Sequence, residues 1–338
     1  MRAARFHAHG GPGVLQYEDA PDPEPAAGRA IVRVRACALN HLDLWQRRGL
    51  ERVRIPLPHI SGSDVAGEVV EGGGAIRPGT RVLLQPGLSC GRCGECLAGR
   101  DNDCLSYDVL GYRSDGGYAE LVSVPSENLL PIPDHVEFAV AAAFPLTFLT
   151  AWHMLMTRAS LQAGDVVLVI AGGSGVGQAA IQIAKLHGAR VFATSGSSKL
   201  ERARELGAED VFDHYAEDYS KRIRAATANR GADIVIEHVG QATWERSLRS
   251  LARAGRLVIC GATTGPHGGV NLTHLFARQL SLLGSYMGRK QELVEAAQLF
   301  FDGKLAPVID ERLPLSEARA AHERLESGQQ FGKIVLIP

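Results

Sequence analysis

The sequence lacks the features that mark membrane, secreted and nucleic-acid-binding proteins. No run of about 18 apolar residues occurs, so we expect no membrane-spanning helix. The opening segment MRAARFHAHGGPGV has no apolar core, and we therefore expect a cytoplasmic protein without a secretion signal. The net charge is −1, which provides no basic surface for nucleic acid or for an anionic membrane. Neither of these is expected as a partner.

Repeats and low-complexity tracts are also missing, and a chain of 338 residues is too long for one ordinary core. Two domains are the natural expectation. The 38 glycines gather at residues 72–74, 172–177 and 261–269. Glycine concentrated at a few places indicates turns at fixed positions rather than disorder.

Cysteine is sparse, but four of the six cysteines stand together in the segment SCGRCGECLAGRDNDC. The spacing C-x2-C-x2-C-x7-C lets thiolates converge on one zinc ion, and four sulfur ligands leave no open position for chemistry. Disulfides and chance are the alternatives, and a reducing cytoplasm disfavours disulfides. Cys37 and Cys260 have no ligand-like neighbours and are expected to be buried. We therefore predict one structural Zn2+ bound by Cys90, Cys93, Cys96 and Cys104.

The first 125 residues have the pattern of short strands and turns. Apolar and charged residues alternate at 30–38, as in a half-buried strand. Residues 65–70, 81–84 and 117–124 are further strand candidates, with glycine-rich turns between some of them. This pattern predicts a small, mostly antiparallel β domain that carries the cysteine segment as an insertion. A helix at 291–301 and a strand at 333–337 are predicted to return to this domain.

From residue 138 onward, short apolar runs alternate with helical stretches. Continuous runs of Val, Ile and Leu between helices indicate a parallel sheet buried on both faces. Six such strands match a doubly wound nucleotide-binding domain. The predicted fold class is therefore α/β, with residues 1–125 and 290–338 in a β-rich catalytic domain and residues 126–289 in a Rossmann domain. The six strands are expected at 166–170, 190–194, 210–212, 234–237, 256–260 and 281–284.

The first of these six strands leads into the glycine-rich segment AGGSGVG and then into a helix. This is the context that a dinucleotide-binding fingerprint requires, because glycines let the backbone approach a pyrophosphate and the helix N-terminus offers N–H donors. A glycine turn that serves only helix packing is the alternative. The candidate cofactor-binding residues are Gly172, Gly173, Ser174, Gly175, Val176 and Gly177.

The second strand lacks the acid that NAD enzymes place about 20 residues after the glycine turn to hold the ribose 2′-hydroxyl. Thr194 stands there, and no carboxylate appears before Glu201. The segment instead offers hydroxyls and a cation to a 2′-phosphate, from Ser195, Ser197 and Lys199. NADP(H) is therefore the predicted cofactor. A solvated loop of serine and lysine, compatible with either cofactor, is the alternative.

These motifs, together with ISGSDVAGEVVEGGG, AAAFPLTFLTAWHML and the ending GKIVLIP, resemble the medium-chain dehydrogenase/reductase superfamily over essentially the whole chain. The resemblance implies a GroES-like β domain, a Rossmann domain, and hydride transfer between a nicotinamide and a small substrate. It also implies that Phe331 lies beside the cofactor and that His214 stands where quinone reductase relatives often have a tyrosine near the 2′-phosphate. Dimers through the last Rossmann strand, near LSLLGSYMG, are common in such proteins, so a homodimer or homotetramer is expected.

The residues that hold a catalytic zinc in alcohol dehydrogenases of this superfamily are replaced. Their Cys-His-x-Asp motif reads NHLD here, so Asn40 stands for the cysteine, and their Gly-His-Glu motif reads GSD, so Ser63 stands for the histidine. The third ligand position falls near Leu146. Asn and Ser are poor zinc ligands and Leu is none. The segments NHLDLWQRRG and GSDVAG are similar instead to the quinone oxidoreductase branch, which needs no catalytic metal but usually lacks the cysteine segment.

The sequence thus predicts an NADPH-dependent enzyme that delivers hydride to a quinone or an α,β-unsaturated carbonyl, where charge delocalises and a few fixed donors can stabilise it. The candidate donors are Asn40 and Ser63, with His41 and Thr147 near them by the resemblance. Asp43 completes the catalytic candidates, although a short carboxylate at this place also suits a helix cap. The alternative is that Asn40 and Ser63 form hydrogen bonds only with the backbone and take no part in catalysis.

Two other functions are consistent with the sequence. The cysteine segment alone suggests a zinc-type alcohol dehydrogenase that uses NAD or NADP. A non-catalytic NADPH-binding protein is a third possibility from a different class. His41, His59 and Asp64 are the candidates for an unorthodox second metal site.

Overall fold

The computed structural model describes residues 1–50 and 53–338, which form two compact units. The first unit comprises Met1–Leu146 and Arg289–Pro338, and the second comprises Thr147–Gly288. The first boundary lies further along the chain than the boundary at 125/126 expected from the sequence. The reason is that strand β9 (Leu129–Pro131) pairs with β5 (Arg81–Leu84), and helix α3 (Phe138–Ala142) packs against β3 (Arg29–Ala38).

A seven-stranded mixed sheet organises the first unit. Its order is β16–β17–β3–β4–β5–β9, and β8 also pairs with β3. All pairs are antiparallel except β16–β17, so the predicted β-rich domain is confirmed with one parallel pair added. In β3 the valines are buried while Arg33 and Arg35 face solvent, which is the alternation expected of a strand with one buried face. The remaining strands of the sheet are β4 (Asp64–Glu71), β8 (Leu121–Pro125), β16 (Ile309–Pro314) and β17 (Lys333–Ile337).

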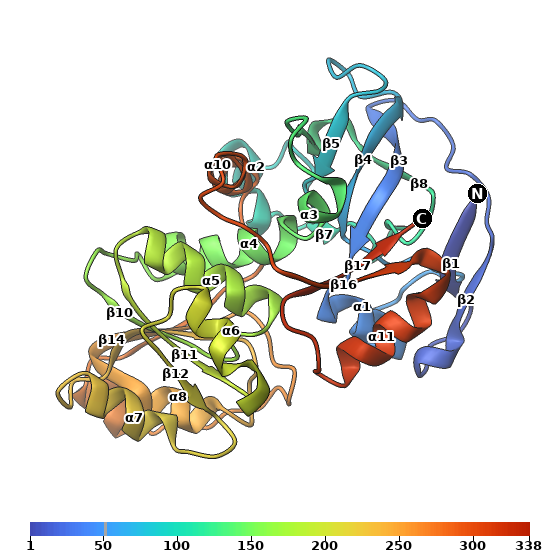
Figure 1. Ribbon diagram of the computed structural model, residues 1–338. Helices are drawn as coiled ribbons and strands as arrows, with labels where there is room; N and C mark the ends of the chain where they lie inside the picture. The colour runs from blue at the N-terminus through green and yellow to red at the C-terminus, as the bar shows by residue number, and fades with distance from the viewer. Residues whose placement is uncertain (51–52) are drawn as a thin grey trace. The chain divides into compact units, whose positions relative to one another are not determined.

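The end of the chain completes the sheet and core of the first unit. Strand β17 inserts between β16 and β3, and Figure 1 shows these C-terminal strands in red beside the blue β3. The core joins Ala4 and Val34 from the start of the chain with Leu325 and Leu336 from its end. The other elements of this unit are β1 (Arg2–Phe6), β2 (Leu15–Asp19), β6 (Gly87–Leu88), β7 (Asp108–Val109), α1 (His41–Arg48), α2 (Gly94–Leu97), α10 (Lys290–Phe301) and α11 (Ala318–Glu326), with short 3-10 turns η1 (Pro12–Val14), η2 (Asp101–Asp103), η3 (Ser126–Asn128) and η6 (Leu315–Glu317).

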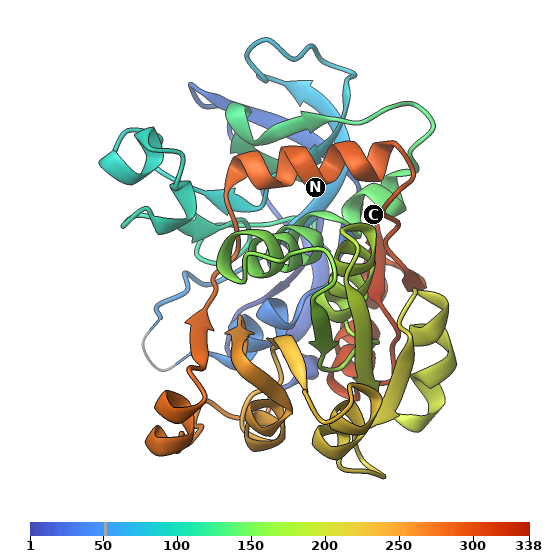
Figure 2. The ribbon, with the colours of Figure 1, turned by 90° about the vertical axis from the view of Figure 1, so that its left-hand side faces the viewer.

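The second unit is built on a six-stranded parallel sheet in the order β12–β11–β10–β13–β14–β15. Figure 2 shows these strands side by side, with β15 at the left end. Every residue of β10 is buried, as in a strand covered on both faces. The strands are β10 (Val166–Val169), β11 (Arg190–Ser195), β12 (Asp210–Asp213), β13 (Ala232–Glu237), β14 (Leu251–Ile259) and β15 (Ser281–Gly284).

Helices cover both faces of this sheet, which confirms the doubly wound fold. Helices α5 and α6 lie on one face, and α7 and α8 on the other (Figure 1). The strand order reverses between β10 and β13, and ligands bind such folds at the carboxyl ends of the strands beside that reversal. The helical segments are α4 (Pro145–Trp152), the π-helical η4 (His153–Arg158), α5 (Gly175–Leu186), η5 (Ser197–Lys199), α6 (Leu200–Glu205), α7 (Tyr219–Ala226), α8 (Trp244–Ser250) and α9 (Leu272–Ala277).

Within residues 1–50 and 53–338, no helix is both long enough and apolar enough to cross a membrane.

Candidate active site

The four cysteines predicted to bind zinc come together beside helix α2. All four sulfur atoms lie within 4.8 Å of one another, with 3.9 Å between Cys90 and Cys96 and 3.5 Å between Cys93 and Cys96. Tetrahedral coordination at a Zn–S distance of about 2.3 Å separates sulfur atoms by about 3.8 Å. Backbone N–H groups of Arg92 and Cys93 lower the pKa of the Cys90 thiol to about 6, which favours its thiolate, whereas at Cys93 the Cys96 N–H is outweighed by the neighbouring sulfurs, which raise the pKa to about 11. The cluster therefore fits a structural zinc ion.

The alternative metal site on His41, His59 and Asp64 does not form. The Nε2 atom of His59 lies 2.9 Å from the Gly111 carbonyl, and burial lowers the pKa of its ring. The Asp64 carboxylate instead accepts hydrogen bonds from Lys333 and Asn40. Within the described part of the chain, the four cysteines are the one group of three or more His, Cys, Asp or Glu side chains with ligand atoms close enough to share a metal.

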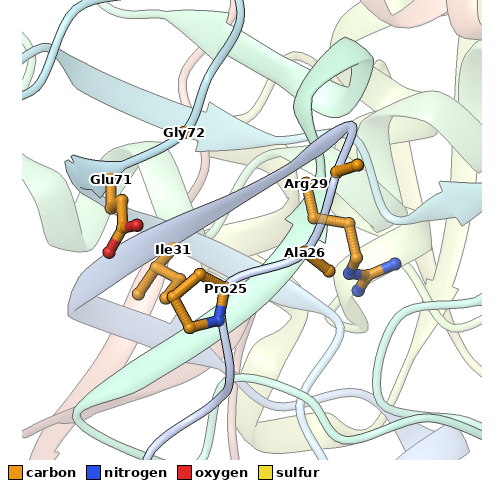
Figure 3. A pocket seen from close by; sticks show the side chains of 7 residues that line it. Pro25, Ala26, Arg29, Ile31, Glu71 and Gly72 are labelled. Carbon is orange, nitrogen blue, oxygen red and sulfur yellow. The ribbon is translucent and has the colours of Figure 1, made fainter.

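A pocket opens at the end of the first unit's sheet where β3 begins and β4 ends (Figure 3). Its walls include Arg29, Ile31 and Glu71, and Ile31 pairs with Glu71 across the two strands. Strands rise about 3.3 Å per residue, so the opposite end of β3, where Asn40 follows, lies roughly 30 Å away. This pocket carries none of the predicted catalytic residues.

Asn40, Asp64 and Lys333 meet at that opposite end of the sheet. Ala38, the last residue of β3, pairs with Asp64 on one side and with Val335 of β17 on the other. Three neighbouring strands therefore bring these side chains together, although 293 residues separate Asn40 from Lys333 in the sequence.

The three side chains form a closed hydrogen-bonded triangle. The ammonium of Lys333 lies 2.6 Å from Asn40 Oδ1 and 2.8 Å from Asp64 Oδ2, and Asn40 Nδ2 donates to Asp64 Oδ2 at 2.9 Å. An ammonium can only donate and a carboxylate can only accept, so the Asn40 amide has one possible orientation. Asp64 is fully buried, and Lys333 and Asn40 are 2% and 6% exposed. A buried carboxylate thus has an ammonium as its counter-charge.

Two other residues of the predicted metal position, Ser63 and Leu146, lie next to Asp64. The backbone N–H of Leu146 donates to Asp64 Oδ1 at 2.7 Å. Ser63 is fully buried, and its hydroxyl has no hydrogen-bond partner among the described residues. His41 is the first residue of α1 and is half-buried, whereas Thr147 is buried and belongs to the second unit.

Asp43 holds the start of helix α1 and is connected to Asn40 through the backbone. Its Oδ2 atom accepts the Asn40 backbone N–H at 2.8 Å and the Tyr118 hydroxyl at 3.0 Å, while its Oδ1 atom is buried without a partner in the described structure. Burial raises the pKa of Asp43 to about 6. This carboxylate is therefore costly to ionise where it lies.

A chain of donors extends from Asp43 toward helix α11. The Tyr118 hydroxyl lies 3.3 Å from His322 Nε2, and the other ring nitrogen of His322 lies 3.1 Å from an Arg47 guanidinium nitrogen. Arginine can only donate, so His322 Nδ1 accepts and Nε2 carries the proton. Burial lowers the pKa of His322 to about 3, which keeps the ring neutral. Arg47 donates to His322, His322 donates to Tyr118, and Tyr118 donates to Asp43, while Arg47 also pairs with Glu326.

The glycine-rich segment forms the predicted turn between β10 and α5. Ser174 caps the helix by accepting the Gly177 N–H at 2.9 Å, and His238 Nε2 lies 2.8 Å from the same hydroxyl. A Cβ atom at Gly177 would lie 2.3 Å from the Ala171 carbonyl oxygen, so no other residue fits there. The turn and the first N–H groups of α5 suit the pyrophosphate of a dinucleotide.

The residues predicted to select the cofactor gather at the ends of β11 and β12. Ser195 pairs with Asp213 across the two strands, and Thr194 Oγ1 accepts the Ala171 N–H at 3.0 Å. His214 Nδ1 lies 3.2 Å from Thr194 Oγ1, and burial lowers the pKa of His214. The Thr194 hydroxyl thus fixes the start of the glycine-rich turn through its hydrogen bond with the Ala171 N–H.

The Asp213 carboxylate, which no sequence motif indicates, also lies there. The Ser197 hydroxyl donates to the Asp213 carboxylate, which also accepts the Tyr215 N–H at 2.9 Å. A carboxylate from the neighbouring strand β12 therefore lies beside Ser197, although none follows β11 directly. Lys199 is half-buried at the end of η5. In the first unit, Phe331 is buried just before β17.

Several residues of these networks escaped the sequence analysis. The sequence indicates Lys333 only as the start of a strand, and it marks neither Tyr118 nor His322 as a functional candidate. Their partners are remote in sequence, at separations of 75 to 293 residues. A glycine before a lysine in an otherwise apolar closing strand, as in GKIVLIP, is the one local signal that points to Lys333.

Two family matches cover most of the chain. Residues 26–134 match the alcohol dehydrogenase GroES-like domain, and residues 175–302 match the zinc-binding dehydrogenase family.

Relatives with two different names match over the whole length. A quinone oxidoreductase of Rattus norvegicus is 30% identical over 349 residues and covers 100% of this chain and 98% of its own. An NAD-dependent alcohol dehydrogenase of Sulfolobus acidocaldarius is 32% identical, with 99% of both chains covered. A crystal structure described as an NAD-dependent alcohol dehydrogenase is 47% identical, has a TM-score of 0.97 and covers 100% of both chains.

Proposed function

Because the chain belongs to the medium-chain dehydrogenase/reductase superfamily, we propose that it is an oxidoreductase that reduces a quinone or an α,β-unsaturated carbonyl with NADPH, without a metal ion at the substrate. The observation that carries the proposal is the triangle of Asn40, Asp64 and Lys333. Asparagine and serine are poor zinc ligands, and the Lys333 ammonium directly beside Asn40 repels a dication. The site offers N–H donors instead.

This donor set matches a reaction in which charge spreads over a conjugated system. Hydride addition to an isolated carbonyl concentrates charge on one oxygen and benefits from a Lewis acid. Addition to a quinone or to the β-carbon of an enone delocalises that charge, so fixed hydrogen-bond donors suffice. The proposed catalytic candidates are Asn40, Ser63, His41 and Thr147, with Asp43 fixing the backbone of Asn40.

The second unit supplies the residues that would hold the dinucleotide. Residues 172–177 and the start of α5 would bind the pyrophosphate, and Ser195, Ser197, Lys199 and His214 would surround the adenosine ribose. The cofactor supplies the hydride, and the protein orients it and excludes water. Phe331 is proposed beside the cofactor by likeness to the family. NADPH is proposed over NADH because hydroxyl and lysine side chains follow β11.

The test is a panel of quinones and enones assayed with NADPH and NADH by absorbance of the reduced cofactor. We expect turnover with NADPH that persists after dialysis against a chelator, with about one zinc per chain retained. Absence of turnover with every quinone and enone would refute the proposal. Tight NADPH binding in such an inactive protein would favour a non-catalytic role.

A second candidate is an alcohol dehydrogenase, and the 47% identity to a protein described by that name favours it. This function needs a second metal, because a neutral alcohol loses its proton with difficulty unless a metal lowers its pKa. Alcohol-dependent reduction of NAD or NADP that stops on chelation, together with two zinc ions per chain, would establish it in place of the first proposal.

We also propose a homodimer or homotetramer assembled through the open edge of the six-stranded sheet. Strand β15 is the last strand of that sheet, and Leu272 and Phe276 on the preceding helix α9 are each 70% exposed. Large apolar side chains beside an unpaired strand edge are typical of an interface. Light scattering of wild type and of Phe276→Glu checks this, and an unchanged mass in the variant contradicts it.

A further inference from the structure

Lys333 is placed with unusual precision for a long, flexible side chain. It begins β17, and Gly332 before it has a positive φ of 88°. A Cβ atom at Gly332 would lie 2.3 Å from the Val308 carbonyl oxygen, so the approach to Lys333 accepts no other residue. With 2% of its surface exposed, Lys333 is held where its ammonium faces Asn40 and Asp64.

Lys333 and Asn40 each have an N–H group that finds no acceptor among the described residues. An ammonium has three N–H groups, and the described residues provide two acceptors for Lys333, Asn40 Oδ1 and Asp64 Oδ2. The Asn40 amide has two N–H groups, one of which goes to Asp64. Adjacent to Asp64, the buried Ser63 hydroxyl has no partner in the described structure. A substrate oxygen that accepts from Lys333 and Asn40 would use both remaining N–H groups.

We propose that Lys333 is a catalytic residue whose ammonium, with the Asn40 amide, binds the carbonyl oxygen of the substrate and stabilises the negative charge that develops on it. This inference rests on the proposed function and names the electrophile of that site. A full positive charge acts strongly in a buried place because little water screens it. The ammonium thereby stabilises negative charge on the oxygen of a conjugated carbonyl, as a metal ion does on the oxygen of an isolated carbonyl.

The step balances for an enone. The cofactor provides a hydride, one hydrogen nucleus with two electrons. When the β-carbon accepts it, the π pair of the C=C bond shifts to join the α-carbon to the carbonyl carbon, and the π pair of the C=O bond moves onto the oxygen, giving an enolate. Lys333 and Asn40 donate N–H hydrogen bonds to the enolate oxygen. A proton from solvent then adds to the α-carbon, and the C=O bond re-forms.

The experiment uses a probe that reports polarisation of a carbonyl without turnover. The absorption of 4-(dimethylamino)cinnamaldehyde shifts to the red when its carbonyl oxygen accepts strong hydrogen bonds or a positive charge. The probe is added to the full-length protein with oxidised cofactor, and kcat and KM are measured separately with an enone and NADPH. The variants are Lys333→Met, Lys333→Arg and the double variant Lys333→Met/Asp64→Asn, with Lys304→Met as the control for loss of an exposed lysine.

We expect a red shift in wild type and Lys304→Met, a smaller one in Lys333→Arg, and none in the two variants with methionine. The value of kcat should fall by about 100-fold or more in the methionine variants with a smaller change in KM, because one oxyanion donor is typically worth 10²–10³ in kcat. Lys333→Met could lose activity either because the donor is missing or because the unpaired Asp64 charge unfolds the protein. The double variant removes both charges, so a loss of activity in it is due to the missing donor.

Four results would contradict either the role of Lys333 or the proposed function. A red shift and kcat that survive in the double variant would overturn the role of Lys333. A wild-type red shift abolished by a chelator would assign the electrophile to a metal instead, and a wild type without any shift would also refute the proposal. A shift that depends on Lys333 in a protein that reduces no enone or quinone would overturn the proposed function but not the carbonyl site.

Discussion

The ammonium of Lys333 is the counter-charge of a fully buried carboxylate, so the variant Lys333→Met should be strongly destabilised. The Nζ–Oδ2 distance to Asp64 is 2.8 Å, and the two side chains are 2% and 0% exposed. Breaking a buried pair by removing one partner costs about 3–5 kcal/mol of unfolding free energy, because the other charge stays behind unpaired. For a unit of about 150–250 residues, this lowers the melting temperature by roughly 6–20 °C.

The double variant Lys333→Met/Asp64→Asn tests the cause. It removes the unpaired charge, and we expect its unfolding free energy to return to within about 1–2 kcal/mol of wild type. Urea unfolding followed by circular dichroism measures the four corners of this cycle. The control Lys304→Met removes an exposed lysine 3.7 Å from Asp302, and its effect should stay below about 0.5 kcal/mol.

A Lys333→Met protein within about 1 kcal/mol of wild type would contradict charge compensation, because a buried carboxylate without a counter-charge destabilises the folded state by more than that. Charge compensation would also be refuted if the double variant were less stable than Lys333→Met. In that case hydrogen bonding, rather than charge compensation, would explain the triangle.

Three further predictions concern other parts of the chain. Burial raises the pKa of Asp43 from an ordinary 3.8 to about 6, so its contribution to stability is fully present below about pH 4 and is lost as the pH rises through 6. Asp43→Asn should remove about 3 kcal/mol of that pH dependence in urea titrations, and parallel curves for both proteins would contradict this. Cys93→Ser should reduce zinc from about one ion per chain to near zero by elemental analysis, and a retained ion would show that the four-cysteine site is wrong. Asp213→Asn removes a negative charge beside the expected 2′-phosphate and should lower KM for NADPH about 3–10-fold relative to KM for NADH, whereas an unchanged ratio would place the phosphate elsewhere.

Local patterns were sufficient to predict the fold. The expected strand at 81–84 is β5 without any change, and the six apolar runs after residue 138 became β10 to β15 in the predicted parallel sheet. Period and composition carry this information because a strand buried on both faces must be apolar throughout. The four cysteines were equally legible, since all their ligand atoms come from one short segment.

The candidate site was predictable in part. The sequence shows that Asn40 and Ser63 replace the metal ligands. It does not show that the Lys333 ammonium contacts Asn40, because this contact depends on how β17 pairs with β3. Asp213 was hidden for the same reason, since it lies on β12 and faces Ser197 of the preceding loop. Side chains that meet across strands leave no local spacing to recognise.

The arrangement of β17 has a consequence for the order in which the protein can be built during synthesis. The second unit is one continuous segment, Thr147–Gly288, and all its strands have left the ribosome before the chain is complete. The sheet of the first unit lacks β17 until the last residues emerge, and with it lacks the group that neutralises Asp64. Domains generally fold as units while the chain is being made. A nascent chain that stops before residue 333 would therefore carry the complete six-stranded sheet of the second unit, but a first unit without β17 and with Asp64 lacking its counter-charge.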